Sequence, residues 1–240
     1  MRNCLACGLL AVLLGFGLAR AGETGDFNAT VEQFGAHNRV AVGYLRTGNS
    51  DLASLEMDRM RDAWKGVASR FGKPPDGYAA DPQLYTTTML EVSTRLVTAT
   101  IMTSSGRQDA ARDVLLSIRD VLSDLRKANS IYLLADCVRD ANAAMDALYV
   151  YNDRALDWSK SETRFNVAAK ASIYGYTLER CDGMAADEVR RNEEFRRLID
   201  GAKAGLALVP KAVNTRDGEL LHRILIELRS FDNLLAFRYG

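Results

Sequence analysis

The chain has 240 residues, of which 48% are hydrophobic and 26% are charged, and its 31 basic side chains balance 31 acidic ones. This much apolar surface excludes a disordered chain. The lysines and arginines are interleaved with acids, which argues against nucleic-acid binding because that function normally needs a clustered basic surface. Only four prolines occur, and the composition is typical of a helical globular protein.

The N-terminus has the three parts of a secretory signal peptide. Arg2 is followed by an apolar run over residues 5–18 and by a small-residue cleavage site that ends at Ala21. The run is shorter than the ~20 residues that span a bilayer, so we expect cleavage and no permanent transmembrane anchor. The predicted mature protein covers residues 22–240 and is periplasmic or secreted.

Eight segments with helical periodicity follow, and none shows the alternation of a strand. Proline, glycine or a capping residue separates each segment from the next. The predicted helices cover residues 28–47, 49–72, 82–103, 108–128, 129–151, 162–180, 186–208 and 219–237. We therefore predict an all-α fold of antiparallel helical hairpins, forming either a bundle or a short helical-hairpin array. The helices are expected to form one domain over residues 22–240, with a candidate sub-boundary at residues 152–161, around Trp158.

Three of the predicted hairpin turns share a pattern of side chains. Each has a threonine or serine four residues before an acid, then an apolar residue six positions after the acid and an arginine ten positions after it. The apolar residues are Met57, Leu115 and Leu225, and the arginines are Arg61, Arg119 and Arg229. We predict that the three apolar side chains are buried at equivalent places in their hairpins.

One of these turns has the spacing of a known repeat. Tyr44, Gly48 and Ala53 stand where a tetratricopeptide unit has its tyrosine, glycine and alanine, and Gly106 and Ala111 repeat two of the three. These two short segments resemble hairpins of that family. The resemblance implies a helical hairpin at each place, and it does not extend to the family's superhelix.

The two cysteines of the mature chain are Cys137 and Cys181. Export places them in an oxidising compartment, and the sequence between them is centred on the irregular stretch around Trp158. Two antiparallel helices that turn there would bring the sulfur atoms level. We therefore predict a disulfide across the fifth and sixth helices.

Few residues of the mature chain suit catalysis. Its only histidines are His37 and His222, and motifs for triad hydrolysis, nucleotide binding, zinc, di-iron or covalent haem are absent from the sequence. We predict no catalytic residue, no metal ligand and no cofactor. The alternative is non-covalent b-type haem, held through His37 and His222 as in bundles that resemble cytochrome b562.

Arg61, Arg119 and Arg229 are candidates for contacts with an anion or a partner if they converge. Otherwise they pair with acids on the helix surface. The sequence thus predicts a periplasmic helical-bundle binding or scaffold protein for a protein or peptide partner, or for a small ligand in a bundle groove. A haem-binding electron carrier is the alternative, and an enzyme that uses only carboxylates and arginines is a third reading.

Overall fold

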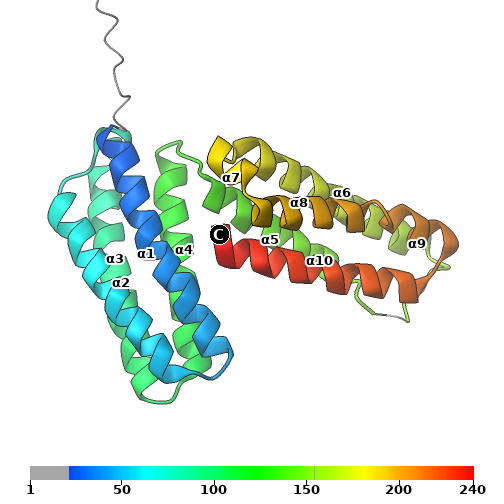
Figure 1. The fold of residues 1–240 in the computed structure, drawn as a ribbon, viewed down its shortest axis with the longest axis horizontal. Coiled ribbons are helices and arrows are strands. Elements are labelled where there is room, and N and C mark those ends of the chain that lie inside the picture. Colours follow the sequence, from blue (N-terminus) through cyan, green and yellow to red (C-terminus); the bar gives the residue numbers. More distant parts are fainter. Residues whose placement is uncertain (1–21, 154) are drawn as a thin grey trace, which may run out of the picture.

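The computed structural model describes residues 22–153 and 155–240. The predicted signal peptide, residues 1–21, lies outside this part of the chain. Within it, every regular element is helical, which confirms the predicted all-α fold. The helices form two bundles that lie side by side, the first coloured blue to green and the second green to red (Figure 1).

The first bundle contains four long helices. They are α1 (Glu23–Arg46), α2 (Ser50–Arg70), α3 (Pro82–Ser104) and α4 (Gln108–Ala128), with a short 3-10 helix, η1 (Asp76–Tyr78), between α2 and α3. Each helix packs against the next, and α1 also packs against α4. This closed arrangement is that of an up-down-up-down four-helix bundle. Of the two predicted alternatives, these helices therefore form the bundle rather than the array.

An aromatic cluster holds the α2–α3 connection on α1. The Phe27 ring lies edge-on to the rings of Phe71 and Tyr78, with centroid distances of 5.3 and 4.9 Å. The Tyr85 hydroxyl donates a hydrogen bond of 2.7 Å to the carbonyl oxygen of Phe71. Buried aromatic pairs of this kind stabilise a fold by more than the apolar area that they bury. Packing of these rings therefore holds the proline-containing loop in place.

Three hairpin turns close with the same backbone hydrogen bonds. Gly48, Gly106 and Arg216 each have positive φ, at 78°, 74° and 57°. The next residue's N–H then bonds to a carbonyl five residues earlier, at 2.9 Å in all three turns. This is the Schellman motif, in which a left-handed residue satisfies the last carbonyls of a helix. Met57, Leu115 and Leu225 are all at most 1% exposed, as the repeated sequence pattern predicts.

The second bundle follows with α5 (Leu134–Tyr149), α6 (Ser161–Met184), α8 (Glu193–Leu206) and α10 (Gly218–Tyr239). The short helices α7 (Asp187–Arg191) and α9 (Val209–Thr215) lie in its connections. Here α5 packs against α6 and α10, and α8 packs against the same two helices, which closes a second bundle. Each bundle has a separate core of buried residues.

The predicted disulfide is present in the second bundle. The sulfur atoms of Cys137 on α5 and Cys181 on α6 are bonded, and the two Cα atoms are 5.4 Å apart. Both cysteines are fully buried. The turn between α5 and α6 lies at the irregular stretch around Trp158, as the spacing of the cysteines predicts.

A buried ion pair marks the passage from one bundle to the other. The guanidinium of Arg126 on α4 donates two hydrogen bonds, of 2.8 and 2.7 Å, to the carboxylate of Asp136 on α5. Burial alone would raise the pKa of Asp136, but these bonds, the charge of Arg126 and the Leu133 N–H lower it below its ordinary value. Two charges removed from water are stable only when paired in this way, so the pair restrains the start of α5 against the end of α4.

Some predicted boundaries were wrong. The fifth helix begins at Leu134 rather than at residue 129, because Ser130 takes a left-handed conformation (φ 56°) that closes α4 instead of capping a new helix. The seventh helix is broken at Asn192, whose side chain caps α8. The chain passes from one core to the other at residues 129–133, and the predicted sub-boundary at 152–161 lies between α5 and the start of α6, inside the second bundle.

None of the helices in residues 22–153 and 155–240 is long and apolar enough to cross a membrane.

Candidate functional site

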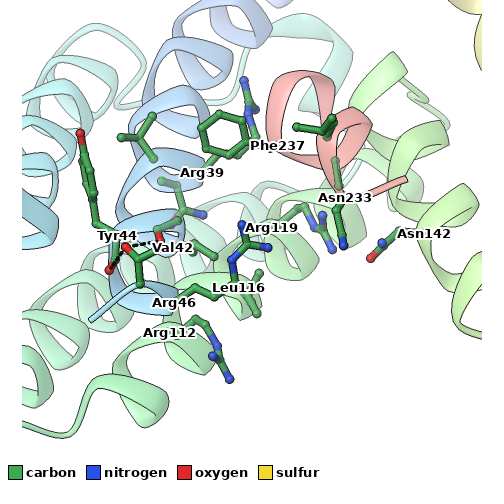
Figure 2. A pocket seen from close by; sticks show the side chains of 16 residues that line it. Arg39, Val42, Tyr44, Arg46, Arg112, Leu116, Arg119, Asn142, Asn233 and Phe237 are labelled. Atoms are coloured by element: carbon green, nitrogen blue, oxygen red, sulfur yellow. Dashed lines mark hydrogen bonds between the residues drawn. The ribbon is translucent and has the colours of Figure 1, made fainter. Parts of the chain in front are cut away.

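A cleft of about 610 Å³ lies where the two bundles meet. Its walls come from α1 and α4 of the first bundle and from α5 and α10 of the second (Figure 2). This volume is within the range of small-molecule sites, about 300–1,000 Å³. The bundles touch beside the cleft, where the Arg39 guanidinium donates a hydrogen bond of 2.7 Å to the carbonyl oxygen of Gly240.

The lining is cationic and contains no acidic side chain from the described residues. Four arginines contribute to it, as Figure 2 shows: Arg39, Arg46, Arg112 and Arg119. Asparagines and apolar side chains make up most of the remainder, including Asn142, Asn233, Val42, Leu116, Leu234 and Phe237. Since arginine presents a planar fork of N–H donors that matches carboxylate and phosphate, the cleft has the chemistry of an anion site.

Two of the four arginines already have counter-charges. Arg39 forms an ion pair of 2.7 Å with Glu32 on α1. Arg112 lies 3.2 Å from Asp109, one turn earlier on α4. Both acids are themselves largely exposed, so these pairs are typical surface pairs that are worth little.

The other two, Arg46 and Arg119, have no ion pair or side-chain hydrogen bond to any described residue. Arg46 is exposed in the last turn of α1. Arg119 is half-buried, and its Nε is buried without a hydrogen-bond acceptor. Burial lowers the pKa of Arg119 below its ordinary value, yet a guanidinium stays protonated at neutral pH. Arg119 is thus a partly desolvated cation that forms no direct ion pair, and the charges of Asp120 and Asp232 only partly offset the effect of its burial.

A buried carboxylate lies behind the cleft in the second bundle. Asp232 on α10 is 1% exposed and accepts a hydrogen bond of 2.6 Å from the amide of Asn142, which lines the cleft. Its Oδ1 is buried without a hydrogen bond. Burial raises the pKa of Asp232 to about 6, against the lowering effects of Asn142, Arg229 and Arg119. Asn142 therefore connects the wall of the cleft to a buried carboxyl group whose pKa is raised.

The three arginines predicted from the repeated turns do not converge. Arg119 lines the cleft. Arg61 is on the surface of α2 and pairs with Asp58, while Arg229 lies within the second bundle, 2.7 Å from Asp146. Equivalent positions in similar hairpins thus have different surroundings, although the charges of Arg119 and Arg229 both lower the pKa of Asp232.

The two histidines lie in different bundles. The Nδ1 atom of His37 on α1 is 2.7 Å from the carboxylate of Glu56 on α2. That of His222 on α10 is 2.9 Å from the carbonyl oxygen of Asn152. The structure does not bring the two imidazoles together, and the haem prediction for His37 and His222 stays untested.

Sequence reasoning missed Arg39, Arg46 and Arg112, although a signal for them exists. Arg39 and Arg46 are seven residues apart on α1, and Arg112 and Arg119 are seven apart on α4. A separation of seven places two side chains on one helix face, two turns apart. Two such pairs on helices that pack together predict one basic face.

Among the described residues, no group of three or more histidine, cysteine or acidic side chains is arranged to hold a metal ion. Comparisons with protein-family models, curated proteins and solved structures find no match to this chain.

Proposed function

We propose that this is a binding protein that takes an anionic small ligand in the cleft between its two bundles. The observation that carries the proposal is the state of Arg119, a half-buried guanidinium in a concave site that forms no ion pair with a described residue and whose Nε has no hydrogen-bond acceptor, although Asp120 and Asp232 act on it electrostatically. An unpaired charge that is partly removed from water costs free energy unless a ligand supplies its partner. An anion in the cleft would meet this need, and Arg46 would add a second, solvated cation.

The groups that line the cleft support binding rather than catalysis. Arginine does not lose its proton near neutral pH and asparagine does not titrate, so neither suits a general base. Both are good at orienting an anion through fixed N–H donors. A protein or peptide partner remains the other form of the binding hypothesis, and it would need a surface larger than this cleft.

We also propose that the protein acts outside the cytoplasm, because of the signal-peptide pattern in residues 1–21. The disulfide between Cys137 and Cys181 supports this location, since such bonds persist in oxidising compartments. Intact-mass analysis of the secreted or periplasmic protein should show a chain that begins at Gly22. Recovery of full-length protein from the cytosol would contradict this proposal.

Calorimetric titration with a panel of carboxylates and phosphates tests the binding proposal. We expect at least one organic anion to bind, and Arg119→Gln to weaken its affinity by about tenfold or more, since a charge-assisted hydrogen bond contributes ~1.5–3 kcal/mol. The matched control is Arg61→Gln, because Arg61 has the equivalent place in its hairpin but lies outside the cleft. Equal losses in both variants, or no binding of any anion, would refute the proposal.

A further inference from the structure

The cleft combines its arginines with apolar side chains that are partly exposed. Leu116 on α4 and Leu234 and Phe237 on α10 are each 37% exposed, and all three line the cleft. They belong to different bundles, so they face a common space from both sides of it. Large apolar side chains that share a concave surface are characteristic of ligand sites rather than of an ordinary protein surface.

Glycine lets the Phe237 ring lie close to α1. A Cβ atom at Gly43 would be 3.4 Å from a ring carbon of Phe237, which is tighter than most such contacts. The ring therefore lies against the backbone of α1 and forms a flat apolar wall between the two bundles. This wall stays partly open to the cleft, because the ring is still 37% exposed.

The polar and apolar groups alternate along the helices that form the first wall. On α4 the order is Arg112, Leu116 and Arg119, and on α1 Val42 lies between Arg39 and Arg46. Seven residues of helix span about 10 Å, so each apolar residue lies about half that distance from an arginine. A ligand that reached Arg119 with an acidic group would thus lay its adjoining atoms on Leu116.

Of the two unpaired cations, Arg119 is the one that benefits more from an anion. Arg46 is exposed and remains solvated without a partner, whereas Arg119 is half-buried with an unsatisfied Nε. A charge in a partly desolvated site interacts more strongly with its partner than one in water. A single acidic group bound at Arg119 would therefore gain most of the electrostatic interaction energy that the cleft offers to an anion.

We infer that the ligand is an amphiphilic organic acid, with one acidic head at Arg119 and an apolar body against Leu116, Leu234 and Phe237. This inference rests on the proposed function and adds the ligand's class to it. The head is a carboxylate or a phosphate monoester, both of which match a guanidinium fork. The body is a hydrocarbon chain or an aromatic group, because the wall opposite the arginines offers the apolar side chains of Leu234, Ala236 and Phe237 beside its two asparagines, and the amide of Asn142 already donates to Asp232.

The test is a calorimetric series of straight-chain acids: acetate, butanoate, hexanoate, octanoate and decanoate. We expect affinity to rise with chain length, by up to about fourfold for each methylene that is fully buried. Octyl phosphate, compared with octanoate, shows which acidic head the site prefers. Octanol, which keeps the chain but lacks the charge, should bind at least tenfold more weakly than octanoate.

Two substitutions of exposed leucines separate the apolar contribution from the charge. Leu116→Asn places a polar group in the cleft and should flatten the dependence of affinity on chain length. Leu90→Asn is the control, because Leu90 is also exposed, at 67%, but lies on α3 and does not line the cleft. It should leave the whole series unchanged.

The outcomes distinguish this inference from the proposed function. If anions bind through Arg119 but acetate binds as well as decanoate, the ligand is a small polar anion and the inference is wrong, while the proposed function stands. If neither short nor long acids bind, the proposed function fails as well. If octanol binds as tightly as octanoate, the apolar wall acts without Arg119 and the amphiphilic assignment is overturned.

Discussion

Replacing Asp232 with asparagine should change how the stability of the second bundle depends on pH. The carboxyl group is 1% exposed, and its pKa is raised from 3.8 to about 6. Burial is the main cause, and it outweighs the groups that favour the charged form. The polar or charged groups around it come from three helices of the second bundle and from α4: Asn142, Asp146, Tyr174, Arg229 and Arg119.

The sign follows from proton linkage. Because the folded state binds the Asp232 proton more tightly than the unfolded state, the group's stabilising effect is fully present below about pH 4 and is lost as the pH rises through 6. A shift of about two pKa units corresponds to about 3 kcal/mol. Asparagine does not titrate, so Asp232→Asn should gain about this much free energy of unfolding, relative to the wild type, between pH 4 and pH 8.

The assay is urea unfolding across this pH range at constant ionic strength, followed by tryptophan fluorescence. The chain has two tryptophans, with Trp64 in the first core and Trp158 packed against the second. In a Trp64→Phe background the signal therefore reports the second bundle. Asp58→Asn, at an exposed carboxylate of α2, is the control and should run parallel to the wild type. The reasoning is refuted if the unfolding free energy of Asp232→Asn changes with pH in the same way as that of the wild type.

Three further predictions concern stability and redox state. Leu225→Ala should cost ~2–5 kcal/mol of unfolding free energy, because Leu225 is fully buried, and a cost below ~0.5 kcal/mol in urea unfolding would contradict its place in the core. Thiol counting on denatured, unreduced protein should find no free thiol, since Cys137 and Cys181 are bonded, and reduction should cost ~3–4 kcal/mol by the chain-entropy model; two reactive thiols per chain would disprove the bond. Gly48→Ala should destabilise by about 1 kcal/mol because φ is 78° there, whereas Gly66→Ala, in the exposed middle of α2 with open space around it, should stabilise by ~0.5–1 kcal/mol. The melting temperatures of the two variants test this prediction. If both rise or both fall, the positive φ at Gly48 does not explain the difference between the two sites.

Helix positions were predictable where local chemistry decides them. Helix α4 was predicted at 108–128 and has these bounds, because Gly106 closes the preceding helix in a left-handed conformation. The start of α5 was not predictable in this way. Asn129 and Ser130 have the composition of an N-terminal cap, but Ser130 serves the end of α4, and three residues without regular structure precede α5.

The disulfide could be predicted because it depends only on the position of one hairpin turn. Cys137 and Cys181 are nearly equidistant from the loop around Trp158, so two straight helices bring them together. The cleft depends on more than local order. Its walls come from helices of two bundles, and the angle between the bundles is set by contacts such as Arg126 with Asp136, ten residues apart across the junction. No helical periodicity encodes that angle.

The position of the disulfide makes only one of the two bundles sensitive to reducing agents, among the residues that the structure describes. Both sulfur atoms belong to fully buried residues of the second bundle, so a reducing agent reaches them only when α5 and α6 separate. The rate at which a mild thiol reduces this disulfide therefore measures how often the second bundle opens. The first bundle has no cysteine among its described residues. Its opening is therefore not detected by the reduction assay. A ligand that contacts both bundles would stabilise the closed second bundle. It would thus lower the rate of disulfide reduction even if it contacted neither cysteine.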